Sequence, residues 1–354
     1  MRTSWFLGAA GLVATAALAQ NGRPPPPSST PAPIKIGKPS SSGSGNTQAP
    51  IKIGKPAGSE GQGIGTEKQI YEATLKQPLQ PVTTSWKVGE PLKLLDPVAT
   101  HVCLLTGISG NFAGGGERVV VGIDKNASGG ARWYISGSSG QAELRATATC
   151  VAKAKFVPAV LNTSRLASYK LDHHMNGACA DHIAASGWGY DKYAHFISEV
   201  AGKWRGGGEQ LAVVRTGQNL GAIRVNGCSG FVDGAVTALG NFAPGAIARY
   251  WTANGNTGTP ENATFARLSQ NAKSSWLPGG EPFIAMDNGT PLAPVDQAIC
   301  GIVYLSGKMQ GYGESVDIEQ KPVLGKMYWT VRLSNQADGG FLSTAVRCFA
   351  RDQR

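Results

Sequence analysis

The sequence predicts an all-β protein: three tandem repeats of short antiparallel β modules, each small and sandwich- or barrel-like, stabilised by disulfides behind a disordered N-terminal linker. The first observation is a phrase that recurs at 109–117, 201–209 and 306–314. Each copy runs small residue, Gly, spacer, large apolar residue, spacer, Gly, any residue, Gly, Glu. A phrase repeated in this way is typical of a duplicated structural unit.

The second observation is a two-residue hydrophobic period in the segments around the phrase. Leu144, Ala146, Ala148 and Cys150 alternate with polar residues, and the segment 342–348 has the same pattern. A period of two indicates a strand with one buried face. Gly and Asn turns divide the first copy into expected strands at 102–109, 118–123, 132–136 and 143–151.

The third observation is the spacing of the six cysteines. Cys103 and Cys300 each lie fourteen residues before the Glu that ends their phrase, and Cys150 and Cys348 close the same two copies. The spacing therefore pairs cysteines within a copy, as in exported proteins. The predicted bridges are Cys103–Cys150 and Cys300–Cys348, which leaves Cys179 with Cys228.

The chain divides into a leader, a linker and three modules. Residues 1–19 have the basic start, apolar stretch and small-residue end of a signal peptide, which predicts a secreted or extracellular protein, periplasmic or surface-attached if bacterial. Residues 20–65 are rich in Pro, Gly and Ser and contain the octapeptide APIKIGKP twice. The expected modules are 66–155, 156–268 with an insertion, and 269–354, and a short helix is expected at 66–77.

The middle module departs from its neighbours. His195 lies where the outer copies have their first Cys. Aligning 249–251 with 132–134 places about thirty extra residues near 216–245 in this module, including Cys228. We expect the middle module to lack the usual bridge and to tie its insertion to the preceding segment.

The net charge of +10 does not indicate nucleic-acid binding. Residues 20–65 carry +4 of it, from five basic residues and one acidic residue, and the remaining charge is spread thinly. After the leader, no stretch approaches the twenty apolar residues of a membrane-spanning helix. We therefore expect no nucleic-acid partner and no embedding in a membrane.

Aromatic residues are the candidate ligand-binding residues. Pairs recur near the third strand of each copy, and neighbours on a strand face opposite sides, so one of each pair is expected to face outward. Outward aromatic rings stack on sugars; packing against an adjoining module is the alternative. The candidates are Trp133, Tyr134, Trp204, Tyr250, Trp251, Tyr328 and Trp329.

A second candidate site is the histidine-rich part of the middle module. Imidazoles and a carboxylate at this density could bind a metal or act as general acid–base groups, although no spacing matches a known metal motif, and ordinary loop polarity is the third explanation. The candidates are His173, His174, Asp181, His182 and His195. No catalytic residues and no cofactor are predicted.

These observations favour a secreted, non-enzymatic repeat protein that binds glycans or an anionic surface polymer through repeated aromatic sites. They are compatible with a homo-oligomer. One alternative is a structural protein of an extracellular layer, filament or coat. The other is a hydrolase or metal-dependent enzyme whose site lies in the divergent middle module. The sequence contains no serine-elbow or cysteine-protease signature.

Overall fold

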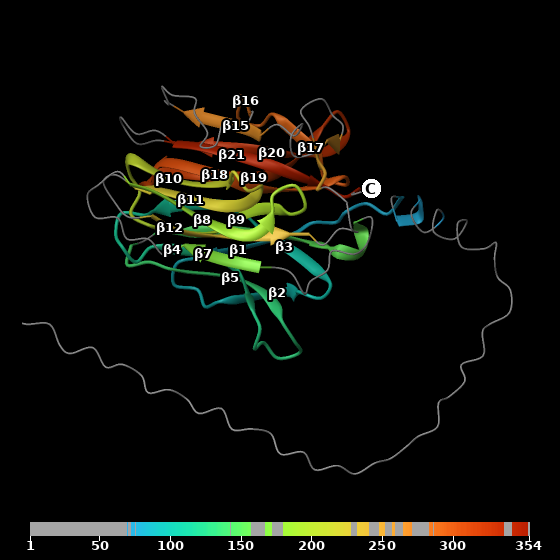
Figure 1. Cartoon of the computed structure of the whole chain (residues 1–354), viewed down its shortest axis with the longest axis horizontal. Coiled ribbons are helices and arrows are strands. Elements are labelled where there is room, and N and C mark those ends of the chain that lie inside the picture. Colours follow the sequence, from blue (N-terminus) through green and yellow to red (C-terminus); the bar gives the residue numbers. More distant parts are fainter. Residues whose placement is uncertain are drawn as a thin grey trace, which may run out of the picture. The chain divides into compact units, whose positions relative to one another are not determined.

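The computed structural model describes residues 69, 72–74, 76–141, 143–156, 167–171, 180–227, 232–240, 248–251, 257–258, 265–270, 283–285, 287–335 and 342–352 (Figure 1). They all belong to one compact unit, Ser59–Arg354. The predicted signal peptide and linker, and the pair Cys179–Cys228, lie outside the described residues. Residues 72–74 are helical, within the segment where a helix is predicted.

The described chain is almost entirely β, as predicted. Module 1 contains β1 (Val82–Lys87), β2 (Lys93–Pro97), β3 (His101–Asn111), β4 (Arg118–Asp124), β5 (Arg132–Ser138) and β6 (Arg145–Ala152), followed by the short helix η1 (Lys153–Lys155). Module 2 contains β7 (Ala167–Leu171), β8 (Ala180–Gly189), β9 (Ala194–Gly202), β10 (Arg205–Arg215), β11 (Leu220–Gly227) and β12 (Val232–Leu239). Module 3 contains β15 (Phe265–Gln270), β17 (Pro291–Pro294), β18 (Ala298–Lys308), β19 (Gln310–Val323), β20 (Lys326–Ser334) and β21 (Leu342–Ala350). Its first strand, β15, begins four residues before the expected boundary at 269 and pairs with the last strand of the module, as β1 and β7 do in theirs. β16 (Phe283–Ala285) is an additional short strand beside β15, and the short strands β13 (Tyr250–Trp251) and β14 (Thr257–Gly258) precede β15.

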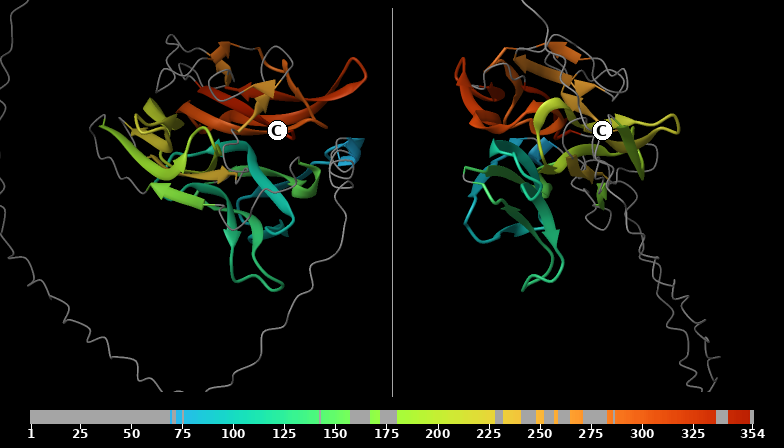
Figure 2. Two further views of the ribbon diagram at one scale, coloured as in Figure 1. Left: turned by 45° about the vertical axis from the view of Figure 1, so that its right-hand side comes forward. Right: turned by 90° about the vertical axis from the view of Figure 1, so that its left-hand side faces the viewer.

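The three modules exchange strand partners in a cycle. The third strand of each module pairs with the fourth strand of another: β3 with β19, β9 with β4, and β18 with β10. Every sheet is therefore built by two modules, and Figure 2 shows teal, yellow-green and orange-red strands meeting in one body. We call them the 1–3 sheet (β1-β6-β3-β19-β20-β17), the 1–2 sheet (β2-β5-β4-β9-β12-β7) and the 2–3 sheet (β8-β11-β10-β18-β21 with its short edge strands). The modules are thus parts of one core instead of separate small sandwiches or barrels.

The repeated phrase lies where the three modules meet. Its large apolar residues, Phe112, Trp204 and Met309, are all fully buried. The backbone N–H of Phe112 donates to Met309 O at 2.8 Å, that of Met309 to Trp204 O at 3.1 Å, and that of Trp204 to Phe112 O at 2.8 Å. This closed ring of hydrogen bonds leaves no polar backbone group of the three unpaired inside the core. The phrase is the structural centre of the molecule.

The first glycine of the phrase has nearly the same φ in all three copies. Gly110, Gly202 and Gly307 have φ values of 111°, 106° and 120°. Side chains with a Cβ rarely adopt this region, so each chain reversal into the centre requires glycine.

The predicted disulfides of the outer modules are confirmed. Cys103–Cys150 joins β3 to β6 and Cys300–Cys348 joins β18 to β21, each between residues directly opposite in the ladder. At the same ladder position of the middle module, His195 of β9 faces Ala238 of β12. The predicted register of His195 is correct, and no bridge forms at that position.

The predicted alignment of the second half of module 2 is wrong. The strand that pairs with β10, as β5 pairs with β4, is β11, and it lies inside the segment 216–245 that we expected to be an insertion. Residues 250–251 form the short strand β13 beside β21. The apolar residues of β11 and β12 alternate as in the other modules, but the two strands have no residue motif in common with those modules by which they could be aligned.

Candidate ligand-binding groove

Each sheet has a seam where two modules join, and the third strand of each module bulges just before it. The ladder register shifts past Thr106 in β3, Ser198 in β9 and Val303 in β18. The residues that follow these bulges are Gly107, Glu199 and Tyr304, four positions after Cys103, His195 and Cys300. They are structurally equivalent and face Asp317, Val120 and Ala212 across the three seams. The three seams can therefore be compared residue by residue.

In the 1–2 sheet the side chain of Glu199 fills the seam. Glu199 is buried, and the Arg118 guanidinium holds its carboxylate with two contacts, Nε to Oε1 at 2.8 Å and Nη2 to Oε2 at 2.9 Å. A two-pronged Arg–carboxylate contact is among the stronger polar interactions in proteins. The seam is occupied by the protein itself.

In the 2–3 sheet the ring of Tyr304 fills the seam. Its hydroxyl donates to Ser306 Oγ at 2.8 Å and accepts from Gln210 Nε2 at 2.9 Å. The side chain is 4% exposed, so the phenol is covered as well as hydrogen-bonded. This seam is also occupied.

In the 1–3 sheet the equivalent residue is Gly107, and the seam is open. A groove of about 540 Å³ lies over it, lined by β1, β3, β6, β19 and β20. A Cβ on residue 107 would lie 2.9 Å from Thr147 Cβ and 3.1 Å from Asp317 Oδ1, so the absence of a side chain lets Thr147 and Asp317 each approach the backbone of residue 107. Both filled seams have alanine where this one has Thr147, namely Ala235 and Ala345. The groove therefore exists because of a local sequence difference in an otherwise repeated architecture.

The floor of the groove is a polar row that runs across the sheet. Ser85, Thr147, Gly107, Asp317 and Arg332 are successive partners on adjacent strands. Their neighbours in the sheet core face the other side and are apolar, as a two-residue period requires.

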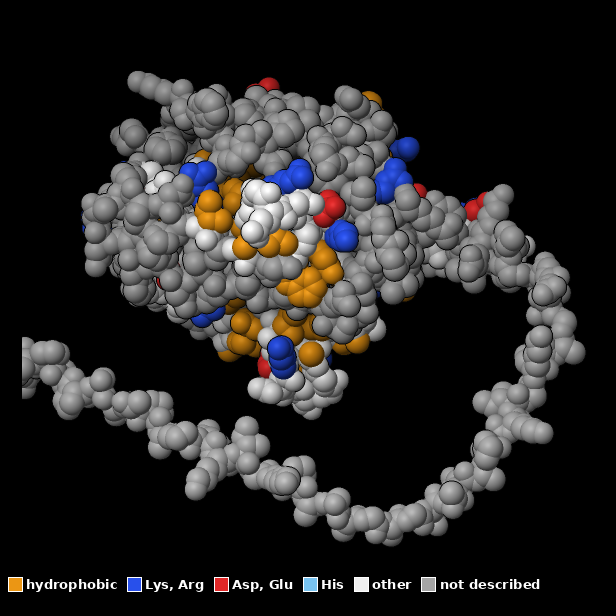
Figure 3. Space-filling model, in the orientation of Figure 1, with side chains coloured by type: hydrophobic (Ala, Val, Ile, Leu, Met, Phe, Trp, Pro, Cys, Tyr) orange, Lys and Arg blue, Asp and Glu red, His pale blue; other side chains and the backbone are white. Residues whose placement is uncertain are grey.

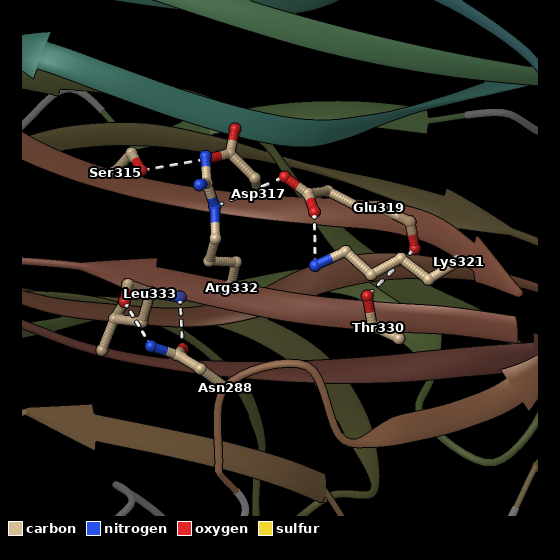
Figure 4. Close-up of polar contacts among 8 residues, drawn as sticks. All are labelled: Asn288, Ser315, Asp317, Glu319, Lys321, Thr330, Arg332 and Leu333. Carbon is tan, nitrogen blue, oxygen red and sulfur yellow. Dashed lines mark hydrogen bonds and ion pairs between the residues drawn. The ribbon is translucent and has the colours of Figure 1, made fainter. Parts of the chain in front are cut away.

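Figure 4 shows how Asp317 and Arg332 are held. Ser315 Oγ donates to Asp317 Oδ2 at 2.9 Å, while Arg332 Nη2 lies 3.7 Å from Asp317 Oδ2 and Arg332 Nε lies 3.4 Å from Glu319 Oε1. Partial burial raises the pKa of Asp317 above its usual value, and the contacts from Ser315 and Arg332 oppose that rise. The pair thus presents a carboxylate and a guanidinium side by side at the groove, both still accessible in part.

Two further features fix this end of the site. Asn288 donates from Nδ2 to Leu333 O at 2.8 Å and accepts from Leu333 N at 2.7 Å, which holds the backbone of β20 next to Arg332 (Figure 4). Glu143, at the rim, has a φ of 76°, a conformation that non-glycine residues seldom adopt. Strained backbone of this kind is found preferentially at functional sites.

Four of the seven aromatic candidates are core residues, namely one member of each pair, as the alternation predicts, and Trp204. Trp133, Trp204, Tyr250 and Trp329 are at most 1% exposed, so none offers a face to a ligand. Their polar groups bond internally: Trp133 Nε1 donates to His101 O, Trp204 Nε1 to Ala201 O and Trp329 Nε1 to Ala298 O. The bulk of an indole and a bonded N–H suit it to the core, and this outweighs the repetition that suggested a surface role.

The other three aromatics are partly exposed. Trp251 packs against the edge of the core. Tyr134 lies across Gly122, with ring Cζ 2.6 Å from where a Cβ would be. Tyr328 is on β20, opposite Lys321, on the same face of the sheet as Arg332. Tyr328 is thus the one of these candidates that shares a sheet face with the groove.

The histidine-rich candidates are not brought together in the described part of the chain. His173 and His174 lie outside it, Asp181 and His182 are on β8 of the 2–3 sheet, and His195 is on β9 of the 1–2 sheet. His195 is 2% exposed. Within the described residues no group of three or more His, Cys, Asp or Glu side chains is placed to hold a metal ion.

On the face shown in Figure 3, the Lys and Arg side chains of the described residues are separated from one another and do not form a stripe. A nucleic-acid interface requires clustered positive charge. In the described residues there is also no helix with the length and apolarity needed to cross a membrane.

Sequence reasoning did not identify Gly107, Asp317 or Arg332 as site residues. Of the groove's charged residues only Glu314, the last residue of the third phrase, was among the candidates weighed, and it is fully buried beneath the site. The sequence does contain a signal for the site: the fourth residue after Cys103, His195 and Cys300 differs in each copy and is Gly, Glu and Tyr, respectively. Its meaning depends on which strands pair.

No protein-family model, no curated protein and no solved structure matches this chain, so the geometry of the groove is the basis for a functional conclusion.

Proposed function

We propose that the protein is a non-enzymatic glycan-binding protein and that a neutral sugar binds in the groove of the 1–3 sheet. The observation that carries the proposal is that this seam is open while the two equivalent seams are filled by Glu199 and Tyr304. A groove of about 540 Å³ with convergent polar groups is in the usual size range of small-ligand sites. In this proposal the groove of the 1–3 sheet takes the place of the repeated aromatic sites expected from the sequence.

The chemistry of the lining supports a sugar over a phosphate or an acidic polymer. The lining has two cations, Arg145 and Arg332, and three carboxylates, Glu143, Glu314 and Asp317, so the groove offers donors and acceptors without a net positive field. Adjacent hydroxyls of a sugar both donate and accept, and a carboxylate beside a guanidinium satisfies both roles. A phosphate would be repelled by the three carboxylates.

Tyr328 supports a ligand longer than one ring. It lies four residues from Arg332 on β20, which corresponds to roughly 13 Å along a strand. A ring stacked on Tyr328 would therefore belong to the next unit of an oligosaccharide bound at Arg332.

Export fits the same proposal. Two disulfides join buried strands, and disulfides persist in oxidising compartments. Together with the signal-like leader, they support a protein that meets glycans outside the cell.

The test is a glycan array with the mature protein, followed by titration calorimetry of the best ligand. Replacing Arg332 with Ala should weaken binding by about 10- to 100-fold, because a hydrogen bond to a charged group is worth about 1.5–3 kcal/mol. Arg224→Ala is the matched control. Arg224 on β11 faces Ala212 of β10 in the 2–3 sheet, as Arg332 on β20 faces Asp317 of β19 in the 1–3 sheet. The control should bind like the wild type.

Absence of any array signal would overturn the proposal. If the protein instead assembled with increasing concentration in light scattering, the structural alternative would take its place.

A further inference from the structure

The two filled seams indicate what the open one is shaped to hold. Tyr304 and Glu199 are the equivalents of Gly107 in the other two sheets. The polar end of each side chain reaches along its strand to the next pair of residues that face each other across the seam. The Tyr304 hydroxyl meets Ser306 and Gln210, which are direct partners across the 2–3 seam. The Glu199 carboxylate meets Arg118, whose partner across the 1–2 seam is Ala201.

The corresponding row of the open seam is Ser109 opposite Ser315. Ser109 is the counterpart of Ser306, with the same side chain, and Ser315 is the counterpart of Gln210 and Arg118. Both serines line the groove. In the filled seams, residues at these two positions bind the polar end of Tyr304 or Glu199. In the open seam the same positions are serines whose hydroxyls line the groove.

We infer that the ligand places a hydroxyl-bearing six-membered ring over Gly107, where the phenol of Tyr304 lies in the 2–3 sheet, with a ring hydroxyl bonded to Ser109 and Ser315. The inference rests on the proposed function and assigns the ring as a pyranose. Tyr304 is then an internal equivalent of the ligand: a ring of the same size, whose hydroxyl is bonded by a serine of the same strand. The Tyr304 ring has a single hydroxyl, whereas a pyranose has several. In the open seam, Asp317 and Arg332 bind the additional hydroxyls of the pyranose.

The residue opposite position 107 also differs between the open and the filled seams. A Cβ on residue 107 would be in close contact with Thr147, and in both filled seams the residue at this position is alanine. Only the open seam combines the glycine with a larger, hydroxyl-bearing neighbour, and the Thr147 hydroxyl faces the same space as the serines.

The experiment copies a filled seam into the open one. In the full chain, Gly107→Tyr with Thr147→Ala reproduces Tyr304 and Ala345, and Thr147→Ala alone is the matched control. Binding of methyl glucopyranoside, methyl galactopyranoside and methyl mannopyranoside is followed by saturation-transfer NMR, together with the best array oligosaccharide. We expect the double variant to lose pyranoside binding by at least about tenfold, a loss of 1.4 kcal/mol or more, and the single variant to retain most of it.

A second filled-seam copy keeps the test decisive if the tyrosine variant does not fold. Gly107→Glu with Ser315→Arg and Thr147→Ala reproduces Glu199, Arg118 and Ala235. A melting temperature and a far-UV spectrum like those of the wild type establish that each variant is folded. Ser109→Ala should reduce affinity about 5- to 10-fold, the value of one hydrogen bond, whereas Ser306→Ala should not.

The outcomes separate the two proposals. Sugar binding that Arg332→Ala abolishes but that survives in folded filled-seam variants would overturn the ring position and leave the proposed function. No pyranoside and no array ligand bound by the wild type would overturn the proposed function and the ring position together.

Discussion

His195 occupies in the middle module the place that Cys103 and Cys300 hold in the outer two. Its ring lies nearly parallel to that of Tyr190, with centroids 6.0 Å apart. It fits because Gly221 has no side chain: a Cβ there would lie 2.2 Å from the imidazole. The pKa of His195 is lowered to about 3, chiefly by burial and in part by the nearby charge of Arg347, while a backbone hydrogen bond with Gly189 opposes the shift.

This residue should make stability depend on pH. Between pH 6.5 and 3 the unfolded chain takes up a proton on His195 that the folded chain does not, so the free energy of unfolding should fall by about 1.4 kcal/mol per pH unit as the pH is lowered. The variant His195→Cys with Ala238→Cys copies the outer bridges and removes the titrating group. Urea unfolding at several pH values should give a shallower slope for this variant, and equal slopes would contradict the prediction.

At the scale of elements, the third strands β3, β9 and β18 pack against one another in the core. The residues at the equivalent contact position differ in size. Leu104, Phe196 and Gly301 each follow the Cys or His of their strand. A Cβ on residue 301 would lie 2.5 Å from Phe196 Cδ1 and 3.2 Å from Leu104 Cδ1. The glycine of one strand thus provides the volume that the phenylalanine of another fills, as close packing of a core requires.

The packing predicts a coupled pair. Gly301→Ala should destabilise the protein by about 1–3 kcal/mol, because the added methyl group overfills the core. Phe196→Leu should recover part of that loss in the double variant although it is destabilising alone. A double-mutant cycle by denaturant unfolding measures the coupling, and additive effects of the two changes would show that the residues do not share this volume.

At the scale of the whole molecule, the modules are inseparable because every sheet takes strands from two of them. Module 1 contributes β3 to the 1–3 sheet and β4 to the 1–2 sheet, and each pairs there with a strand of another module. A module on its own would expose both strands as unpaired edges, together with the apolar residues of its half of the centre. The groove exists only in the complete body, since Gly107 belongs to module 1 and Asp317 and Arg332 to module 3.

Residues 66–155 produced alone should therefore not give a folded monomer. We expect no cooperative thermal transition and association through the open edges, whereas residues 59–354 should unfold in a single transition. Circular dichroism and size-exclusion chromatography measure both properties. A dispersed NMR spectrum from monomeric module 1 would contradict the exchange of strands as a requirement for folding.

Much of the fold could be read from local signals. The two-residue period predicted the strands 118–123 and 132–136 close to their observed positions, and the cysteine spacing gave two bridges and the place of His195. Module 2 was misaligned at β11 and β12, its last two strands, which retain only the apolar alternation. The alternation predicted one buried and one outward member in each aromatic pair, but it could not say which member is buried or whether the outward one binds a ligand, because periodicity does not separate a ligand site from a packing contact.

The sequence by itself determined that the chain is β, that it contains three copies of one pattern, and which cysteines of the outer modules face each other, because each of these depends on residues close in the chain or on copies of one pattern. Only the tertiary structure decided that the modules exchange strands and that one seam is open. The physical reason is that Gly107 and Asp317 are distant in sequence and become neighbours through backbone hydrogen bonds between β3 and β19, which any residues could make. Whether a side chain fills a seam or leaves it open can be decided only once that strand pairing is known.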